Sequence, residues 1–221
     1  MYQLTWYKNA SNEGGAMADA IASHGENEVV VHIQSRKSGR MWSSCSEDKL
    51  LKLVTANRNR GVYEVITEYP HKLYFDVDCD KVDNDLAQKC KKQIRTLFPD
   101  AKMAISGSVC TEKKITSLNI CVYNYLIKYS NDRESMKQVC KRWGSPWDWK
   151  VYTNNRNMKC INQSKVTDKR VQEMITYKDH PKRHLIICFL PPTDKAEGVP
   201  TPPPPKKTIR LFSGKILIVY E

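Results

Sequence analysis

The chain has 221 residues, enough for one sizeable domain or two small ones. Charged residues make up 27% and hydrophobic residues 40%, a balance that excludes an intrinsically disordered chain, and no apolar stretch is long enough to span a bilayer. A net charge of +12 and a pI near 9.3 favour polyanionic partners, namely nucleic acid, nucleotides or an anionic membrane surface. A solvated basic face that only maintains solubility would give the same charge.

The eight cysteines are scattered and form no C-x-x-C pair. This spacing argues against a zinc ribbon and against the disulfide framework of a secreted domain. The N-terminal residues lack the apolar core of a signal peptide. We therefore expect an intracellular, reducing compartment.

The first half of the chain predicts strands and one helix. Residues 28–34 are rich in β-branched side chains and predict a strand. Ser46 is a suitable N-cap for a helix that ends near Gly61. Residues 62–67 and 72–79 predict two strands joined by a short turn.

In the second half, a helix is expected at residues 83–98, where apolar side chains recur at helical spacing. A further helix is expected at residues 131–143, where Gly144 and Pro146 end it. Further strands are expected at residues 102–109, 117–127, 149–153, 157–163 and 185–190. This mixture predicts an α+β or split βαβ arrangement around one sheet. The proline-rich residues 199–207 predict an exposed linker or tail, and residues 208–221 would form a docked strand or the start of a longer segment.

Two aspartates share one face of the strand at residues 72–79. Side chains alternate along a strand, so Asp76 and Asp78 point to one side while Phe75 and Val77 pack on the other. Carboxylates about 7 Å apart along one face can share a pair of divalent cations. Asp80 lies on the same face and is a candidate extra ligand, with a place in the following loop as the favoured alternative. An ordinary amphipathic strand with an acidic outer side would give the same pattern.

A basic segment follows Asp148. Between Lys150 and Arg183 the chain has nine lysines or arginines against three acidic residues, a local excess of six. Cations that alternate along a strand can line a triphosphate channel or follow a nucleic-acid backbone. A solvated basic face is the alternative interpretation.

Together these segments resemble the archaeo-eukaryotic primase superfamily, and within it the primase-polymerases and the primase domains of large DNA virus helicase-primases. Residues 63–66 and 72–78 are similar to the family's first motif, in which a tyrosine–phenylalanine pair precedes D-h-E or D-h-D. Asp148, followed by residues 151–159 and closing at Lys165, is similar to the third motif. The resemblance covers about residues 60 to 190.

The family's second motif is S-x-H on a strand between the other two, and here Ser117 and Asn119 stand at its place. In the family the histidine contacts the phosphates of the incoming nucleotide. Asparagine can donate a hydrogen bond but cannot carry positive charge, so this difference predicts weaker phosphate binding. Lys113 and Lys114, a few residues upstream, are candidates to supply the missing charge.

The resemblance implies the archaeo-eukaryotic primase catalytic fold, a mixed or antiparallel sheet with an RRM-like core and flanking helices. It also implies that Asp76, Asp78 and Asp148 hold two Mg²⁺ or Mn²⁺ ions. The implied nucleotide-binding residues are Ser117, Asn119, Arg156, Asn157, Lys159, Lys165 and Lys114. On this basis we expect an N-terminal α/β portion at residues 1–60, a catalytic core at 61–192 and a proline-rich linker or tail at 193–221.

The implied activity is template-directed, metal-dependent synthesis of primers on single-stranded DNA during replication, from ribo- or deoxyribonucleoside triphosphates. One alternative is a polymerase that extends primers or bypasses lesions without starting them. Another is a nucleic-acid-binding module that has kept the fold and lost activity. No G-x-x-x-x-G-K-[ST] loop occurs, so a helicase motor would be another domain or subunit. No membrane partner is expected, and a viral relative would act in the host nucleus or at a cytoplasmic replication site.

Overall fold

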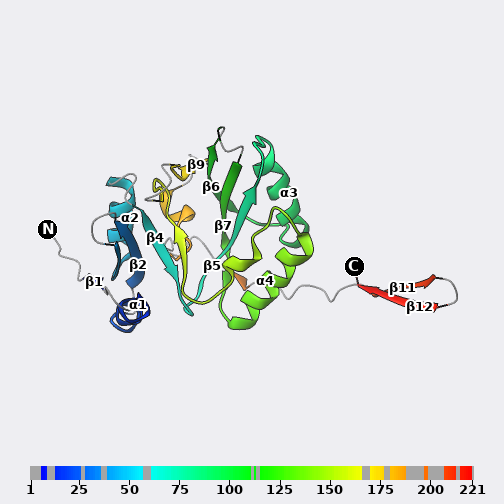
Figure 1. Cartoon of the computed structure of the whole chain (residues 1–221), viewed down its shortest axis with the longest axis horizontal. Coiled ribbons are helices and arrows are strands. Elements are labelled where there is room, and N and C mark those ends of the chain that lie inside the picture. Colours follow the sequence, from blue (N-terminus) through cyan, green and yellow to red (C-terminus); the bar gives the residue numbers. More distant parts are fainter. Residues whose placement is uncertain are drawn as a thin grey trace.

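The fold is α+β, with two mainly antiparallel sheets and four α-helices in the described part of the chain (Figure 1). The computed structural model describes residues 6–8, 13–25, 28–35, 39–56, 61–110, 112, 115–165, 170–176, 180–187, 197–198, 207–212 and 215–220. The predicted α+β class is confirmed. The expectation of one sheet was wrong, because the strands expected at residues 62–67 and 72–79, which a short turn joins, belong to different sheets.

The first sheet has the strand order β1–β3–β2–β4–β8, and all its pairings are antiparallel. Its strands are β1 (Tyr7–Lys8), β2 (Glu28–Ser35), β3 (Gly39–Ser46), β4 (Val62–Ile66) and β8 (Arg156–Lys159). Helix α1 (Glu13–Ala22) packs on the face that carries Val30 and Trp42. Helix α2 (Glu47–Ala56) packs on the opposite face, against Val29 and Val31. The sheet thus combines strands from before and after residue 60.

The second sheet has the order β10–β7–β6–β9, and β5 pairs with β7 as well. Its strands are β5 (His71–Cys79), β6 (Met103–Cys110), β7 (Ile115–Ile127), β9 (Glu173–Met174) and β10 (Glu197–Gly198). Helices α3 (Leu86–Leu97) and α4 (Ser130–Trp143) lie on the side of this sheet away from the first sheet (Figure 1). On that side the ring of Phe75 packs against Trp143 and Trp147, with centroids 5.7 and 5.3 Å away.

Two further strands, β11 (Lys207–Phe212) and β12 (Lys215–Tyr220), pair with each other as an antiparallel hairpin. Residues 208–221 were expected to form a docked strand or the start of a longer segment, and the structure gives a two-stranded hairpin instead. The proline-rich residues 199–206 lie outside the described residues. None of the described helices is long and apolar enough to cross a membrane.

Three predicted strands differ from the structure. Residues Trp149–Val151 form a 3₁₀ helix, η1, because the Asp148 carboxylate accepts a hydrogen bond from the Lys150 N–H and caps a turn. The strand expected at 157–163 is limited to β8 and begins one residue earlier. Residues 185–187 are not a strand, since the Leu185 N–H bonds to the carbonyl of Lys182 and closes the 3₁₀ helix η2 (Pro181–His184). Residues 188–190 of the third predicted strand lie outside the described residues.

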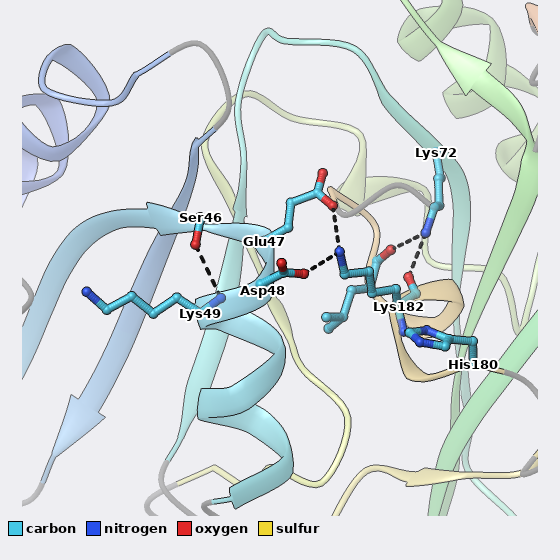
Figure 2. A network of polar contacts seen from close by, with 8 residues as sticks. Ser46, Glu47, Asp48, Lys49, Lys72, His180 and Lys182 are labelled. Carbon is cyan, nitrogen blue, oxygen red and sulfur yellow. Dashed lines mark hydrogen bonds and ion pairs between the residues drawn. The ribbon is translucent and has the colours of Figure 1, made fainter. Parts of the chain in front are cut away.

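A polar network connects the two sheets through η2 (Figure 2). The Nζ of Lys182 lies 2.7 Å from Asp48 and 3.5 Å from Glu47, both in the first turn of α2. On β5, the buried Nζ of Lys72 donates to the carbonyls of Lys182 at 2.7 Å and Leu185 at 2.9 Å. The same short segment therefore binds a helix of the first sheet and a strand of the second, which helps to fix the space between the sheets.

Candidate active site

Three aspartates from two separate segments form a compact carboxylate cluster. Asp76 and Asp78 lie two residues apart on β5 and face the same pocket, as strand alternation predicted. Asp148 immediately precedes η1. One carboxylate oxygen of each residue can be chosen so that all three lie within 4.8 Å of one another.

Backbone hydrogen bonds bring Asp148 to β5. The Asp148 N–H donates to the carbonyl of Asp76 at 2.9 Å, and the Asp78 N–H donates to the carbonyl of Pro146 at 3.0 Å. Val77 and Trp147 form an antiparallel bridge between these bonds. The residues before η1 thus extend the sheet for one step along β5, which places the third carboxylate beside the first two.

Two buried tyrosines fix this arrangement from the interior. The hydroxyl of Tyr74 donates to the carbonyl of Val151 at 2.8 Å, and the hydroxyl of Tyr152 donates to the carbonyl of Tyr74. Burial holds the pKa of both phenols above the usual range, so both hydroxyls remain donors at neutral pH. The reciprocal bonds tie η1 to β5 and make Tyr74 and Tyr152 positioning residues for Asp148.

The cluster concentrates negative charge. Burial, followed by the charges of Asp78 and Asp148, raises the pKa of Asp76 to about 7, whereas Arg156 and Lys159 act in the opposite direction. Oxygen ligands this close together suit Mg²⁺ or Mn²⁺. A divalent cation would relieve the repulsion among the carboxylates, so the residues present fit such an ion.

A pocket of about 320 Å³ opens beside the carboxylates, between β4 and β8 of the first sheet and β5, β6 and β7 of the second. Asp76 and Asp78 of β5 pair with Asn119 and Ser117 of β7, so these four side chains share one wall. The opposite wall carries the cations of β8 and its neighbourhood. The predicted site residues that line the pocket are Asp76, Asp78, Ser117, Asn119, Arg156, Asn157, Lys159 and Lys165.

Asn119 also joins the two sheets. Its Nδ2 donates to the carbonyl of Lys159 on β8 at 3.3 Å. Asn119, which stands where the S-x-H motif has histidine, therefore makes a hydrogen bond between the two sheets at the pocket wall. Lys114, expected to supply charge at this wall, lies outside the described residues.

Several polar atoms of pocket-lining residues are buried without a hydrogen-bond partner among the described residues. These are the Ser108 Oγ, the Arg156 Nε and the Asn157 Oδ1. Leaving such an atom unsatisfied costs about 1–3 kcal/mol. A polar ligand that supplied donors and acceptors here would recover part of that cost.

Sequence reasoning did not single out the polar lining residues Ser108 and Arg170, nor the apolar Ile115 and Met158. Ser108 pairs with Ser117 in the β6–β7 ladder, so the alternating serines at 106 and 108 carried a signal for this face. Arg170 was counted in the basic segment but not singled out. Asp80 lines the pocket but is not in the carboxylate cluster.

Comparison with protein-family models gives no match, and a search of curated proteins gives no similar protein. A function for the chain therefore has to be argued from the geometry of this site and from the motifs in its sequence. Of the features described, the carboxylate cluster facing a cation-lined pocket is chemically the most specific.

Proposed function

We propose that the chain is the catalytic domain of a DNA primase-polymerase, which joins nucleotides on a single-stranded DNA template to make primers. The observation that carries the proposal is the cluster of Asp76, Asp78 and Asp148, within 4.8 Å of one another, beside a pocket lined by cations. The motifs that resemble the archaeo-eukaryotic primase superfamily contain both the three aspartates and the pocket cations Arg156, Lys159 and Lys165. An α+β fold with antiparallel sheets is compatible with the catalytic fold of that superfamily.

The three aspartates would hold two Mg²⁺ or Mn²⁺ ions, because carboxylate oxygens are the ligands that these ions prefer. Bound there, the ions would supply Lewis acidity for attack of a 3′-hydroxyl on the α-phosphate and for departure of pyrophosphate. Tyr74 and Tyr152 hold Asp148 at its distance from Asp76 through the buried bonds to Val151 and Tyr74. The protein thereby fixes the geometry of the ligands before any nucleotide binds.

Arg156, Lys159 and Lys165 would bind the triphosphate, since they line the same pocket as Asp76 and Asp78. Charge-assisted hydrogen bonds of this kind contribute about 1.5–3 kcal/mol each. Ser117 and Asn119 would add neutral hydrogen bonds from β7. A nucleotide in this pocket would have its phosphates between the cations and the carboxylate cluster.

Asn119 is the observation that favours the alternative of an inactive nucleic-acid-binding module. It offers no positive charge, and its amide already donates to the carbonyl of Lys159. The intact carboxylate cluster favours catalysis, because unused clustered carboxylates would only repel a DNA backbone. A primer-extending or lesion-bypass polymerase would use the same site and differs only in whether synthesis can start without a primer.

The test is nucleotide incorporation on single-stranded DNA with labelled ATP or dATP, with Mg²⁺ or Mn²⁺, with and without an annealed primer. We expect products in both formats. Asp76→Asn should abolish incorporation while leaving the circular dichroism spectrum unchanged, because it removes a ligand charge from the cluster. Asp100→Asn, at the exposed turn after α3, is the matched control and should remain active.

Products that require the annealed primer would establish the extending polymerase instead. Absence of incorporation under every combination of nucleotide and metal would overturn the proposal and leave the binding module. Full activity of Asp76→Asn would remove the carboxylate cluster from the mechanism.

A further inference from the structure

An exposed tryptophan surrounded by lysines lies next to the carboxylate cluster. We call Trp149, Lys137, Lys141 and Lys150 the Trp149 patch. The Trp149 side chain is 36% exposed. The Nζ atoms of Lys141, Lys137 and Lys150 lie 4.6, 5.9 and 6.0 Å from its ring centroid.

Packing of the core does not account for this tryptophan. Its neighbours Trp143 and Trp147 contact Phe75. Trp147 belongs to the main hydrophobic core and Trp143 packs against it, whereas Trp149 is not part of a core cluster. Cation–π contacts at exposed sites contribute only about 0.5–1 kcal/mol each, and the three ammonium groups around one ring repel one another. Glu134 lies 3.3 Å from Lys137 and offsets one of these charges. An anion with flat apolar groups complements such a surface.

The position of the patch is fixed relative to the carboxylates. Trp149 follows Asp148 directly, and the Asp148 carboxylate accepts the Lys150 N–H at 2.9 Å, which holds the first turn of η1. Lys137 and Lys141 are four residues apart on α4 and therefore lie on one face of that helix. The backbone that carries Trp149 is therefore continuous with a proposed metal ligand.

We propose that the Trp149 patch binds single-stranded DNA, with an unpaired base stacked on the indole and neighbouring phosphates held by the lysines. Aromatic platforms flanked by cations bind single strands in this way, because every base has a π-face and every nucleotide carries a phosphate. The choice of DNA as occupant rests on the proposed function. The mode of binding rests on the exposed ring, the three lysines and their place beside Asp148.

The experiment measures the affinity of the whole chain for a fluorescein-labelled oligothymidylate and for an abasic oligonucleotide of equal length, by anisotropy with EDTA and without nucleotides. Trp149→Ala should weaken oligothymidylate binding at least about fivefold and leave abasic binding unchanged, because only a base can stack. Lys141→Gln should weaken binding of both ligands and lower the salt slope by about 0.7, the value for one phosphate contact on a single strand. Lys52→Gln, an exposed lysine on α2, is the matched control and should change neither.

Equal affinity of the wild-type protein for both oligonucleotides would overturn the proposal, and so would an unchanged salt slope in Lys141→Gln. Tighter binding of oligouridylate that depends on Trp149 would also overturn it, because RNA would then be the occupant. Trp149→Phe should restore most of the loss, which separates stacking from a folding defect. If the wild-type protein extends primers while Trp149→Ala binds normally, the patch is wrong and the proposed function stands. If binding depends on the patch but no nucleotide is incorporated, the patch stands and the proposed function is wrong.

Discussion

Glu64 lies in the middle of β4 with its carboxyl group inside the protein, where only 1% of the residue is exposed. Its Oε2 accepts a hydrogen bond from the Ile187 N–H at 2.9 Å. Burial raises the pKa of this carboxyl to about 7, although the backbone bonds from Ile187 and Ile186 and the charge of Lys72 oppose the shift. Near neutral pH the folded protein therefore holds a proton that the unfolded chain releases.

This difference makes the stability of the fold depend on pH. Between an unfolded value of 4.5 and a folded value of about 7, the folded form binds more protons than the unfolded form. The free energy of unfolding therefore falls as the pH rises through this window, by about 3 kcal/mol in total, and the contribution is constant above it.

Glu64→Gln should remove that dependence, because the amide does not titrate and its oxygen can still accept the Ile187 N–H. We expect the free energy of unfolding of the variant, minus that of the wild-type protein, to be about 3 kcal/mol larger at pH 8 than at pH 5. Urea unfolding at the two pH values measures this difference. Glu112→Gln, at an exposed turn, is the control for the chemical change. A wild-type-to-variant difference that is the same at both pH values would contradict the assignment.

At the scale of elements, the close approach of β6 to β7 depends on Gly107. A Cβ at this position would lie 2.6 Å from Leu118 Cδ2, 2.9 Å from the carbonyl oxygen of Ser117 and 3.0 Å from Ile175 Cδ1. The leucine side chain can turn away, but the carbonyl belongs to the β6–β7 ladder. The neighbour Ser108 lines the pocket, so a shift of β6 would move a wall of the site.

Gly107→Ala should therefore lower the free energy of unfolding by about 1–3 kcal/mol, the usual range for overpacking a tight interior. It should also weaken nucleotide binding through the displaced wall. Gly25→Ala is the matched control, since a Cβ there would meet no atom closer than 3.7 Å. Thermal unfolding of both variants checks the prediction, and equal midpoints would mean that β6 and β7 are not as close as described.

The elements that the sequence predicted are those with a strong local pattern. Apolar residues at helical spacing identified α3, and the stop at Gly144 and Pro146 marked the end of α4. Alternation placed Asp76 and Asp78 on one face of β5. The pairing of Asp148 with Asp76 was not accessible in this way, because it depends on backbone hydrogen bonds between distant segments. The assignment of β4 to the first sheet also depends on non-local packing, since all five of its residues are buried.

At the scale of the whole molecule, the positive charge has a local distribution that bears on function. The net charge of +12 comes from 36 basic and 24 acidic residues. Four of the cations line the pocket: Arg156, Lys159, Lys165 and Arg170. Three lysines surround Trp149, the residue after Asp148. The first group lines the pocket beside Asp76 and Asp78, whereas the second surrounds the residue that follows Asp148 in the chain.

Binding of single-stranded DNA should then be steeply salt-dependent, because each phosphate contact releases counterions with a slope of about 0.7 on single strands. If about five phosphates are neutralised, the affinity should fall about a hundredfold between 50 and 200 mM salt. Anisotropy titrations at three salt concentrations measure the slope.

Two double variants with the same net charge separate a local contact from overall charge. Lys141→Gln with Lys150→Gln and Lys52→Gln with Lys92→Gln each reduce the net charge from +12 to +10. Only the first pair belongs to the Trp149 patch, whereas Lys52 and Lys92 are exposed on α2 and α3. The first variant should lose about 1.4 from the salt slope, two contacts at about 0.7 each, while the second should keep the wild-type slope. Equal slopes in both variants, or a flat response of the wild-type protein, would mean that the excess charge is a solvated face, because a diffuse field responds to net charge and not to which lysines carry it.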